Sequence, residues 1–408
     1  MTAEALPTLP IGRTCPYAPR AEHVRLQEQE PVSKVTLPSG SDAWVVARFG
    51  DVRTVLSDAR FSADRDRPGF PRIGSQDLEP AERPASPFPK MMLSMDAPEH
   101  GPARRAVLGE FTHRRLAALE PRIQEIVDEH IDAMLAGPRP VDLIQALALP
   151  VPSLVICELL GVPYEDHDFF QERSALIVKQ NDRPEDAPNA QRAMQELAGY
   201  LDGLLRAKEE TPADDLLGRQ ILRQRETNGA VDRAELVGLS FLLLVAGHET
   251  TANMIGLGVL ELSQNPKARE TIQQDPDKTL SAVDEMLRYF TIAEPVLART
   301  VTEDVELGGQ LLKAGDGVLT LSHVANRDPE VFEDPDEFDV ERGGRRHLAF
   351  GYGAHQCLGQ NLARLELQVV VDTLLRRIPG IRPAVPVEDL TFKDDAIVYG
   401  LRELPVTW

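Results

Sequence analysis

The feature that most constrains this chain is a long apolar segment between residues 232 and 265. Asp232 followed by Glu235 is typical of a helix N-terminal capping pair, and Asn265-Pro266 closes the segment. At about 1.5 Å per residue such a helix is roughly 50 Å long, enough to cross a whole domain. Apolar side chains from Leu236 to Ala246 leave no polar face, and a helix that is apolar all round is buried. We therefore expect a molecule built around one long interior helix.

The middle of this segment breaks the pattern with Gly247-His248-Glu249-Thr250-Thr251. A buried carboxylate without a partner costs several kcal/mol, and glycine and threonine both lower helix propensity. These residues therefore predict a catalytic site set into a core helix. Two other interpretations stay open, namely a satisfied polar network in the core and a turn of helix that is exposed.

The rest of the chain predicts a mainly α-helical fold with small β portions near each end. Residues 115–136 and 141–161 carry apolar side chains at helical spacing. The first segment ends before Gly137-Pro138, and the second ends at Gly161 with Pro163 beyond it. Alternation around a Pro/Gly turn predicts a hairpin within residues 34–48, and a second β region covers residues 296–321. Since neither a Gly/Ser linker nor an internal repeat divides the sequence, we expect a single domain over residues 1–408.

Two segments are expected to lack regular structure. Residues 62–98 are rich in proline, which disrupts helices and strand ladders. A loop of that length is usually functional, often as a lid, although a disordered surface excursion is the alternative. Residues 179–190 are polar and predict a mobile loop between two helices.

Charge and cysteine content exclude several classes of protein. The formal net charge of -21 argues against nucleic-acid partners and against binding to an anionic membrane. Cys15, Cys157 and Cys357 are too few and too far apart for a disulfide framework, which indicates a reducing, cytoplasmic compartment. The longest apolar stretch, Leu236 to Gly247, is shorter than the roughly 20 residues that span a bilayer. We expect no membrane association.

A second unusual segment is the glycine-rich loop from Phe350 to Gly359, which contains Cys357. Glycines let the backbone fold tightly and approach a flat ligand closely. The helical pattern that follows places Cys357 near a helix N-terminus, where the dipole should lower the pKa of its thiol. Cys357 is therefore expected to be a nucleophile or a metal ligand, whereas Cys157 fits a small buried hydrophobe.

These residues resemble the haem-thiolate cytochrome P-450 monooxygenases of the soluble bacterial class, and the chain as a whole is similar to the actinomycete subgroup. The loop matches the pattern F-G-x-G-x-H-x-C-x-G, and the central helix matches A-G-x-E-T-T. Further matches, in the family's order, are Asp96-Ala97-Pro98-Glu99-His100 with Arg104, Glu285-Met286-Leu287-Arg288 and Phe338-Asp339-Val340-Glu341-Arg342. The resemblance implies a haem b between the long central helix and the helix that follows the cysteine loop.

The resemblance also implies a role for each matching residue. Cys357 would be the iron ligand, and Glu249 with Thr250 would deliver protons to dioxygen. The residues expected around the haem are His100, Arg104, Ala246, Gly247, Arg299, Phe350, Gly351, His355, Cys357 and Gly359. The ion-pair network of Glu285, Arg288 and Arg342 would serve folding and haem retention. The expected substrate-pocket residues are Met92, Leu93, Leu243, Ile292, Ala293, Val296 and Val398, with Met91, Ala246, Gly247, Thr291 and Ile397 beside them.

An apolar pocket implies an apolar small molecule, such as a polyketide, a statin or another drug-like compound. No G-x-G-x-x-G or P-loop motif occurs, so electrons would come from a separate ferredoxin and its NAD(P)H-dependent reductase. A local basic patch could receive that donor, although ordinary solvated arginines are the alternative. Its members would be Arg104, Arg105, Arg114, Arg115, Arg345, Arg346 and Arg364. Two other functions compete, namely a haem sensor or carrier without turnover, and a thiol hydrolase in which His355 is the base for Cys357.

Overall fold

The computed structural model describes residues 6–10, 13, 15–73, 86–178, 187–293, 297–344, 346–394, 396 and 398–408. Its α-helices are α1 (Ala21–Gln29), α2 (Phe49–Ser57), α3 (His100–Leu108), α4 (His113–Ala136), α5 (Pro150–Leu160), α6 (His167–Val178), α7 (Ala187–Glu210), α8 (Leu216–Asn228), α9 (Arg233–Gln264), α10 (Pro266–Gln274), α11 (Thr279–Phe290), α12 (Ser322–Ala325) and α13 (Gln360–Arg377). Its strands are β1 (Val32–Thr36), β2 (Asp42–Val46), β3 (Phe61–Ser62), β4 (Val141–Asp142), β5 (Ala298–Val301), β6 (Val305–Leu307), β7 (Gln310–Leu312), β8 (Gly317–Thr320), β9 (Arg382–Pro383) and β10 (Pro405–Thr407).

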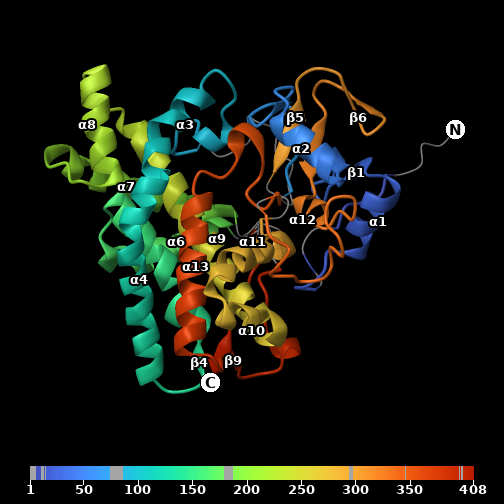
Figure 1. Ribbon diagram of the computed structural model, residues 1–408. Helices are drawn as coiled ribbons and strands as arrows, with labels where there is room; N and C mark the ends of the chain where they lie inside the picture. The colour runs from blue at the N-terminus through green and yellow to red at the C-terminus, as the bar shows by residue number, and fades with distance from the viewer. Residues whose placement is uncertain are drawn as a thin grey trace.

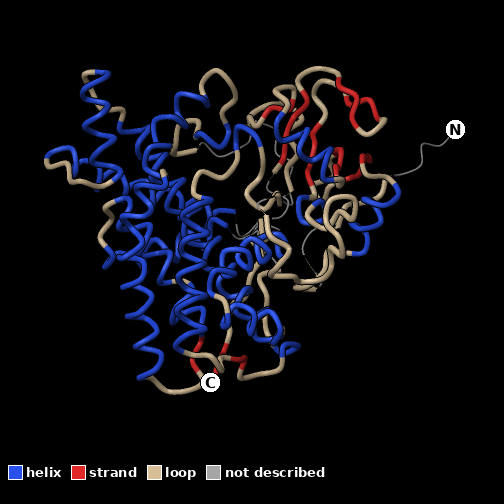
Figure 2. The backbone as a smooth tube through the Cα atoms, in the orientation of Figure 1, coloured by secondary structure: helices blue, strands red, loops and turns tan. Residues whose placement is uncertain are grey.

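Helices and strands separate in space. Most helices, including α4, α7, α8 and α13, form the larger part, and most strands lie beside α1, α2 and α12 in the smaller part (Figures 1 and 2). The predicted fold class, mainly α-helical with small β portions, is confirmed.

Helix α9 forms the interior of the helical part, as predicted. The Asp232 side chain accepts a hydrogen bond from the backbone N–H of Glu235 at 3.0 Å and so caps its first turn. Every residue from Thr251 to Leu262 is buried. The helix packs against α5, α7 and α13, so its apolar sequence is explained by partners on several sides.

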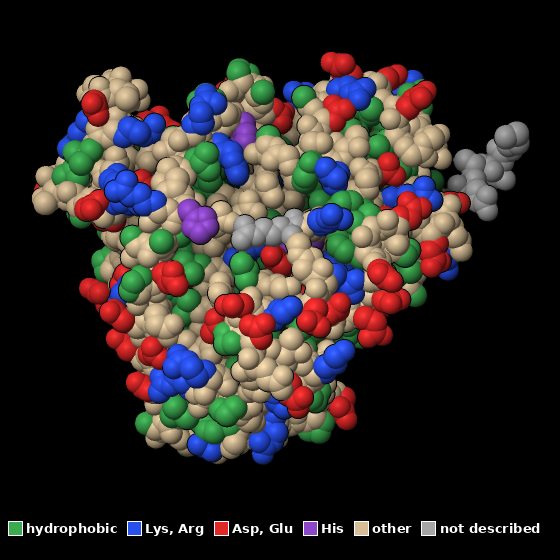
Figure 3. All heavy atoms as spheres, viewed as in Figure 1, with side chains coloured by type: hydrophobic (Ala, Val, Ile, Leu, Met, Phe, Trp, Pro, Cys, Tyr) green, Lys and Arg blue, Asp and Glu red, His purple; other side chains and the backbone are tan. Residues whose placement is uncertain are grey.

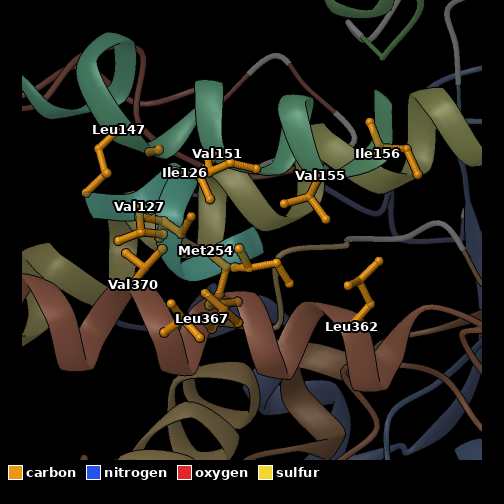
Figure 4. Close-up of a cluster of buried hydrophobic side chains, with 14 of the residues drawn as sticks. Ile126, Val127, Leu147, Val151, Val155, Ile156, Met254, Leu362, Leu367 and Val370 are labelled. Carbon is orange, nitrogen blue, oxygen red and sulfur yellow. The ribbon is translucent and has the colours of Figure 1, made fainter. Parts of the chain in front are cut away.

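Apolar side chains from α4, from α13 and from residues 144–160 interlock around α9. Figure 4 shows this cluster, in which Met254 of α9 lies among side chains of α4, α13 and the segment 144–160. The labelled members are Ile126, Val127, Leu147, Val151, Val155, Ile156, Met254, Leu362, Leu367 and Val370. This packing fixes the spacing between α9 and α13, the two helices expected to enclose the haem.

The prediction of one helix over residues 141–161 is wrong in its first part. Val141 and Asp142 form strand β4, because the C-terminal strand β10 lies beside them and pairs with them. A turn of π-helix over Ile144–Ala148 then leads into α5. The predicted stop is correct, since Gly161 adopts a left-handed conformation with φ of 69° and its N–H caps the last carbonyls.

Both predicted β regions are confirmed. Strands β1 and β2 form the N-terminal hairpin, with Lys34 opposite Trp44. They belong to a sheet of order β1-β2-β8-β5-β3, so the hairpin is joined to the second β region through β2 and β8. Strands β6 and β7 form a further hairpin, whose turn uses Gly308 and Gly309 at φ of 56° and 79°.

The proline-rich segment has little regular structure where it is described. Ser62 belongs to β3, and Met92–Ser94 form a 3-10 turn, so the prediction is wrong at these places, which contain no proline. Residues 74–85 of the expected lid and residues 179–186 of the expected polar loop lie outside the described residues. Residues 187–190 open α7 and are helical, not loop. Among the described helices, none is both long and apolar enough to cross a membrane.

Candidate active site

A large cavity lies between α9 and the loop that precedes α13. Its volume is about 1560 Å³ with the mouth included, and apolar side chains make up most of its wall. Sequence-predicted residues that line it are Met92, Leu93, His100, Arg104, Leu243, Ala246, Gly247, Thr250, Ile292, Ala293, Phe350, Gly351, His355, Cys357 and Gly359. These residues come from five separate segments of the chain and meet at one cavity, whose mostly apolar lining is typical of a site for a small molecule or cofactor.

The cysteine loop holds Cys357 against this cavity. Gly351 and Gly353 turn the backbone at φ of 68° and 73°, and a Cβ on Gly353 would lie 2.5 Å from the Leu56 carbonyl oxygen. The backbone N–H of Cys357 donates to the Phe350 carbonyl at 2.8 Å and closes the loop. Only glycine fits both turns, which explains this part of the sequence pattern.

The expected lowering of the Cys357 pKa is wrong for the protein alone. Burial raises the pKa of the thiol, and the backbone N–H of Gly359 with the charges of Arg104 and Arg364 offset that rise only in part. Cys357 lies before the first turn of α13, which begins at Gln360, so its contact with the helix N-terminus is limited. A thiol with a raised pKa is a poor free nucleophile, whereas a bound cation would stabilise its thiolate. This favours the interpretation of Cys357 as a metal ligand.

Basic side chains gather at the edge of the cavity. The rings of His100 and His355 are in contact, with centroids 4.1 Å apart and planes tilted by 36°. Burial, followed by the charges of Arg299 and His100, lowers the pKa of His355 to about 4. Burial also lowers the pKa of Arg299 to about 10, although Arg299 itself does not line the cavity. Buried guanidinium and imidazole N–H groups therefore lie close together, an arrangement that a bound anion would stabilise.

One polar atom in this cluster lacks a partner among the described residues. The Nε2 atom of His100 is buried and makes no hydrogen bond. Nearby, Arg104 donates to the Gln356 carbonyl at 2.7 Å, and burial lowers the pKa of its guanidinium. Because the His355 ring lies against His100, the geometry does not favour the interpretation of His355 as a base for Cys357.

The polar residues in the middle of α9 point in different directions. The Thr250 hydroxyl donates to the Ala246 carbonyl at 2.8 Å, and Thr250 lines the cavity. Glu249 is only 4% exposed and lies outside the cavity wall, where its carboxylate accepts a hydrogen bond from Lys393 Nζ at 3.3 Å. The sequence-predicted acid and alcohol are thus adjacent in the chain, but only the alcohol faces the cavity.

Comparisons with known proteins agree with this geometry. The family model for cytochrome P450 matches residues 79–378. Cytochrome P450 105A3 of Streptomyces carbophilus is 45% identical over 100% of this chain and 97% of its own length. This chain belongs to the cytochrome P450 family. The solved structure of cytochrome P450 MoxA from Nonomuraea recticatena (CYP105) has a TM-score of 0.90 and 56% identity, with 98% of each chain covered.

A further solved P450 was crystallised with a ligand. It is the mycinamicin VIII C21 methyl hydroxylase MycCI from Micromonospora griseorubida, bound to mycinamicin VIII. It matches with a TM-score of 0.91 and 39% identity, over 99% of this chain and 100% of that one. The family, the actinomycete group and the monooxygenase class expected from the sequence are confirmed by these comparisons.

The ion-pair network of this P450 lies behind the cysteine loop. Glu285 accepts two hydrogen bonds from Arg288, at 2.7 and 2.8 Å, and one from Arg342 Nε at 3.2 Å. Glu285 and Arg288 are 3% and 2% exposed, so their charges are compensated almost entirely by each other and by backbone groups. Removing one partner of such a buried pair costs about 3–5 kcal/mol, which supports a role in folding.

Some predicted residues are placed differently from the expectation, and others cannot be compared with it. Val398 is buried and pairs with Ala293 through an isolated β-bridge, but it does not line the cavity. Val296, Ile397 and Arg345 lie outside the described residues. Arg364, expected in the basic surface patch, is instead 3% exposed and donates to Asp284 Oδ1 at 2.7 Å. That expectation was wrong because spacing alone does not show which face of α13 is buried.

Sequence reasoning missed two charged residues at the site. Glu366 lines the cavity, its buried Oε2 has no hydrogen-bond partner among the described residues, and burial raises its pKa to about 8. Its position among Leu362, Leu365 and Leu367 was the available signal, since a carboxylate in an apolar helical stretch is unusual. Lys393, the partner of Glu249, lies far away in the chain and gave no such signal.

Proposed function

We propose that this P450 is a haem-thiolate monooxygenase in which haem b occupies the cavity and Cys357 is the iron ligand. The observation that carries the proposal is the placement of Cys357 and Thr250 on the wall of one cavity. Bound haem would supply the activation of dioxygen, with one oxygen atom inserted into the substrate. The residues present fit haem. Cys357 can supply the thiolate ligand, and the guanidinium cations of Arg104 and Arg299 can compensate the two negative charges of the cofactor.

The haem propionates would be held by the basic cluster. His100, Arg104, Arg299 and His355 supply the N–H donors that buried carboxylates require. The free Nε2 of His100 is the donor that a propionate would satisfy. Ala246, Gly247, Phe350, Gly351 and Gly359 would line the two faces of the ring.

Proton delivery would fall to Thr250 and Glu249. Thr250 lines the cavity, so its hydroxyl can pass a proton into the cavity. The Glu249 carboxylate would supply protons to that hydroxyl from the side of Lys393, with which it is paired. A Thr250→Ala variant should keep haem and substrate binding but divert electrons to hydrogen peroxide.

The electron donor would be a ferredoxin with its reductase, acting in the cytoplasm. Four exposed arginines on α3, at the start of α4 and just before the cysteine loop could receive an acidic protein, namely Arg105, Arg114, Arg115 and Arg346. Figure 3 shows Lys and Arg side chains on the face that carries α3 and the start of α4 in Figure 1.

The substrate would be an apolar small molecule such as a polyketide, a statin or another drug-like compound. Met92, Leu93, Leu243, Ile292 and Ala293 give the cavity an apolar wall. The similar structure of MycCI was solved bound to mycinamicin VIII, which supports a small-molecule substrate for this chain. A difference-spectroscopy screen with polyketides, statins and steroids would rank these classes.

One experiment tests the proposed function. Purified protein, reduced and exposed to carbon monoxide, should show the far-shifted Soret band of a thiolate-ligated haem. A Cys357→Ser variant should lose that band while Cys157→Ser, a matched change at a buried cysteine of α5, should keep it. A carrier or sensor would bind haem but consume no reductant with ferredoxin, oxygen and substrate present; absence of the band in the wild-type protein would exclude the P450 chemistry.

A further inference from the structure

Thr291, on the cavity wall, has a strained backbone. It follows the last residue of α11 and has φ of 41°, a left-handed conformation that a β-branched residue rarely adopts. Its hydroxyl donates to the Arg288 carbonyl at 2.8 Å, and its own carbonyl accepts from Arg13 at 3.0 Å. Ile292 and Ala293 follow it on the same wall. Such strain persists only where surrounding contacts hold it, so this corner of the pocket is fixed from outside.

Asn326 is one of the residues that hold Thr291 in this strained conformation. Asn326 directly follows α12, is 0% exposed and is absent from the described cavity wall. Its Nδ2 donates to Thr291 Oγ1 at 2.8 Å, and its Oδ1 accepts from the backbone N–H of Leu348 at 2.7 Å. Because the Leu348 N–H can only donate, the orientation of the amide is determined, and both ends of one rigid group are engaged.

The hydrogen bond between Asn326 Oδ1 and Leu348 connects this amide to the backbone of the cysteine loop. The Leu348 carbonyl accepts from the Gly351 N–H at 2.9 Å, and the Phe350 carbonyl accepts from the Cys357 N–H at 2.8 Å. Leu348 and Phe350 both line the cavity below α9. The backbone that sets the position of Cys357 is therefore hydrogen-bonded, through one side chain, to the strained corner of the substrate wall.

We propose that Asn326 is a positioning residue that couples occupancy of the substrate pocket to the geometry of the cysteine loop. This inference rests on the proposed function. A ligand that presses on Thr291 to Ala293 would move the Thr291 hydroxyl, and the rigid amide would carry that movement to the Leu348 N–H. Small changes in the hydrogen bonds and orientation around a metal ligand alter the electronic properties of the metal.

The test separates ligand affinity from the response of the haem. Asn326→Ala removes both hydrogen bonds, and Thr291→Val removes only the hydroxyl, with Thr291→Ser as the conservative control. A ligand found by the spectral screen is titrated into each holoprotein. We expect Asn326→Ala and Thr291→Val to reduce the ligand-induced spin-state change and the ligand-induced shift in reduction potential at least twofold. Affinity for the ligand should change less than about threefold in Asn326→Ala, since that side chain does not reach the cavity.

A second control separates coupling from loss of stability. The Gln27 amide is also buried and donates to the Val324 carbonyl of α12 at 3.0 Å, but it contacts neither Thr291 nor Leu348. Gln27→Ala should lower the unfolding temperature and leave the haem response at its wild-type size. Full responses in both Asn326→Ala and Thr291→Val, whatever their stability, would overturn the inference, and if Asn326→Ala does not fold, Thr291→Val with its serine control decides. A wild-type protein without the thiolate spectrum would instead contradict the proposed function.

Discussion

At the scale of single residues, the pairing of Glu249 with Lys393 makes a buried acid possible in the middle of α9. The carboxylate is nearly buried, and its ammonium partner keeps some contact with solvent. Lys393→Met should lower the free energy of unfolding by about 3 kcal/mol, the low end for breaking a buried pair, because it leaves an uncompensated charge. Urea unfolding followed by circular dichroism measures this loss.

The matched control is the double variant Lys393→Met/Glu249→Gln. A neutral amide needs no ammonium partner, so most of the lost stability should return. If the double variant is as unstable as Lys393→Met alone, the packing of the lysine stem matters and the charge pair does not.

Gly247 gives a second prediction at this scale. A Cβ at this position would lie 3.0 Å from Ile156 Cδ1 and 3.1 Å from Ile156 Cγ1. Alanine gains about 1 kcal/mol of helix propensity over glycine, whereas overpacking costs about 1–3 kcal/mol. We therefore expect Gly247→Ala to be destabilising by about 1 kcal/mol in urea unfolding. Adding Ile156→Val should give less than the sum of the two single changes, and strict additivity would show that the close contact does not matter.

Residue types could be predicted here, but their partners could not. The motif positions of Cys357, Thr250 and Glu285 all correspond to real features of the site. The partners Lys393 and Asn326 come from distant segments, and no local pattern marks them. A contact between distant segments depends on how the chain packs, which a spacing rule does not describe.

At the scale of elements, α1 and α12 meet through two buried histidines. His23 Nδ1 and His323 Nε2 lie 3.0 Å apart, so the two neutral rings share one N–H. Burial lowers the pKa of His23 and lowers that of His323 well below its usual value. The charged groups that influence the pair are Arg13, Arg20, Glu22 and Arg327.

This pair predicts acid sensitivity. The folded state keeps both rings neutral, whereas the unfolded chain takes up protons below a pH of about 6.5. The stabilisation is complete above that pH and is lost as the pH falls, by up to about 1.4 kcal/mol per pH unit for each histidine. His323→Gln should reduce the slope of unfolding free energy against pH between about pH 6 and pH 5. The matched control His113→Gln, at an exposed residue of α4, should leave that slope unchanged.

Elements with a strong local pattern were predicted well. The bounds of α9 and of the N-terminal hairpin follow from capping residues and alternation, which act within a few residues. Residues 141–142 became a strand only because the C-terminal strand β10 pairs with them, a contact over more than half the chain. Such pairing overrides local helix propensity, and the sequence of that segment contains no trace of it.

At the scale of the whole molecule, charge is unevenly distributed. The chain carries a net charge of -21, yet four arginines on α3, at the start of α4 and just before the cysteine loop are exposed, namely Arg105, Arg114, Arg115 and Arg346. An acidic electron donor would be repelled by most of the surface and attracted at this patch, so the patch should set both orientation and association rate. Screening over a Debye length of about 10 Å at 0.1 M salt should weaken that attraction.

Charge reversal tests this arrangement. The variant Arg114→Glu/Arg115→Glu should slow association with a ferredoxin at least tenfold at low ionic strength, and the difference should shrink as salt is added. Stopped-flow reduction of the haem against ferredoxin concentration measures the rate. The matched control reverses Arg223 and Arg225, exposed residues of α8, and should have little effect because α8 lies away from the cysteine loop. Equal association rates for the Arg114/Arg115 variant and the wild type at low salt would show that these arginines are ordinary solvated side chains and that the donor binds elsewhere.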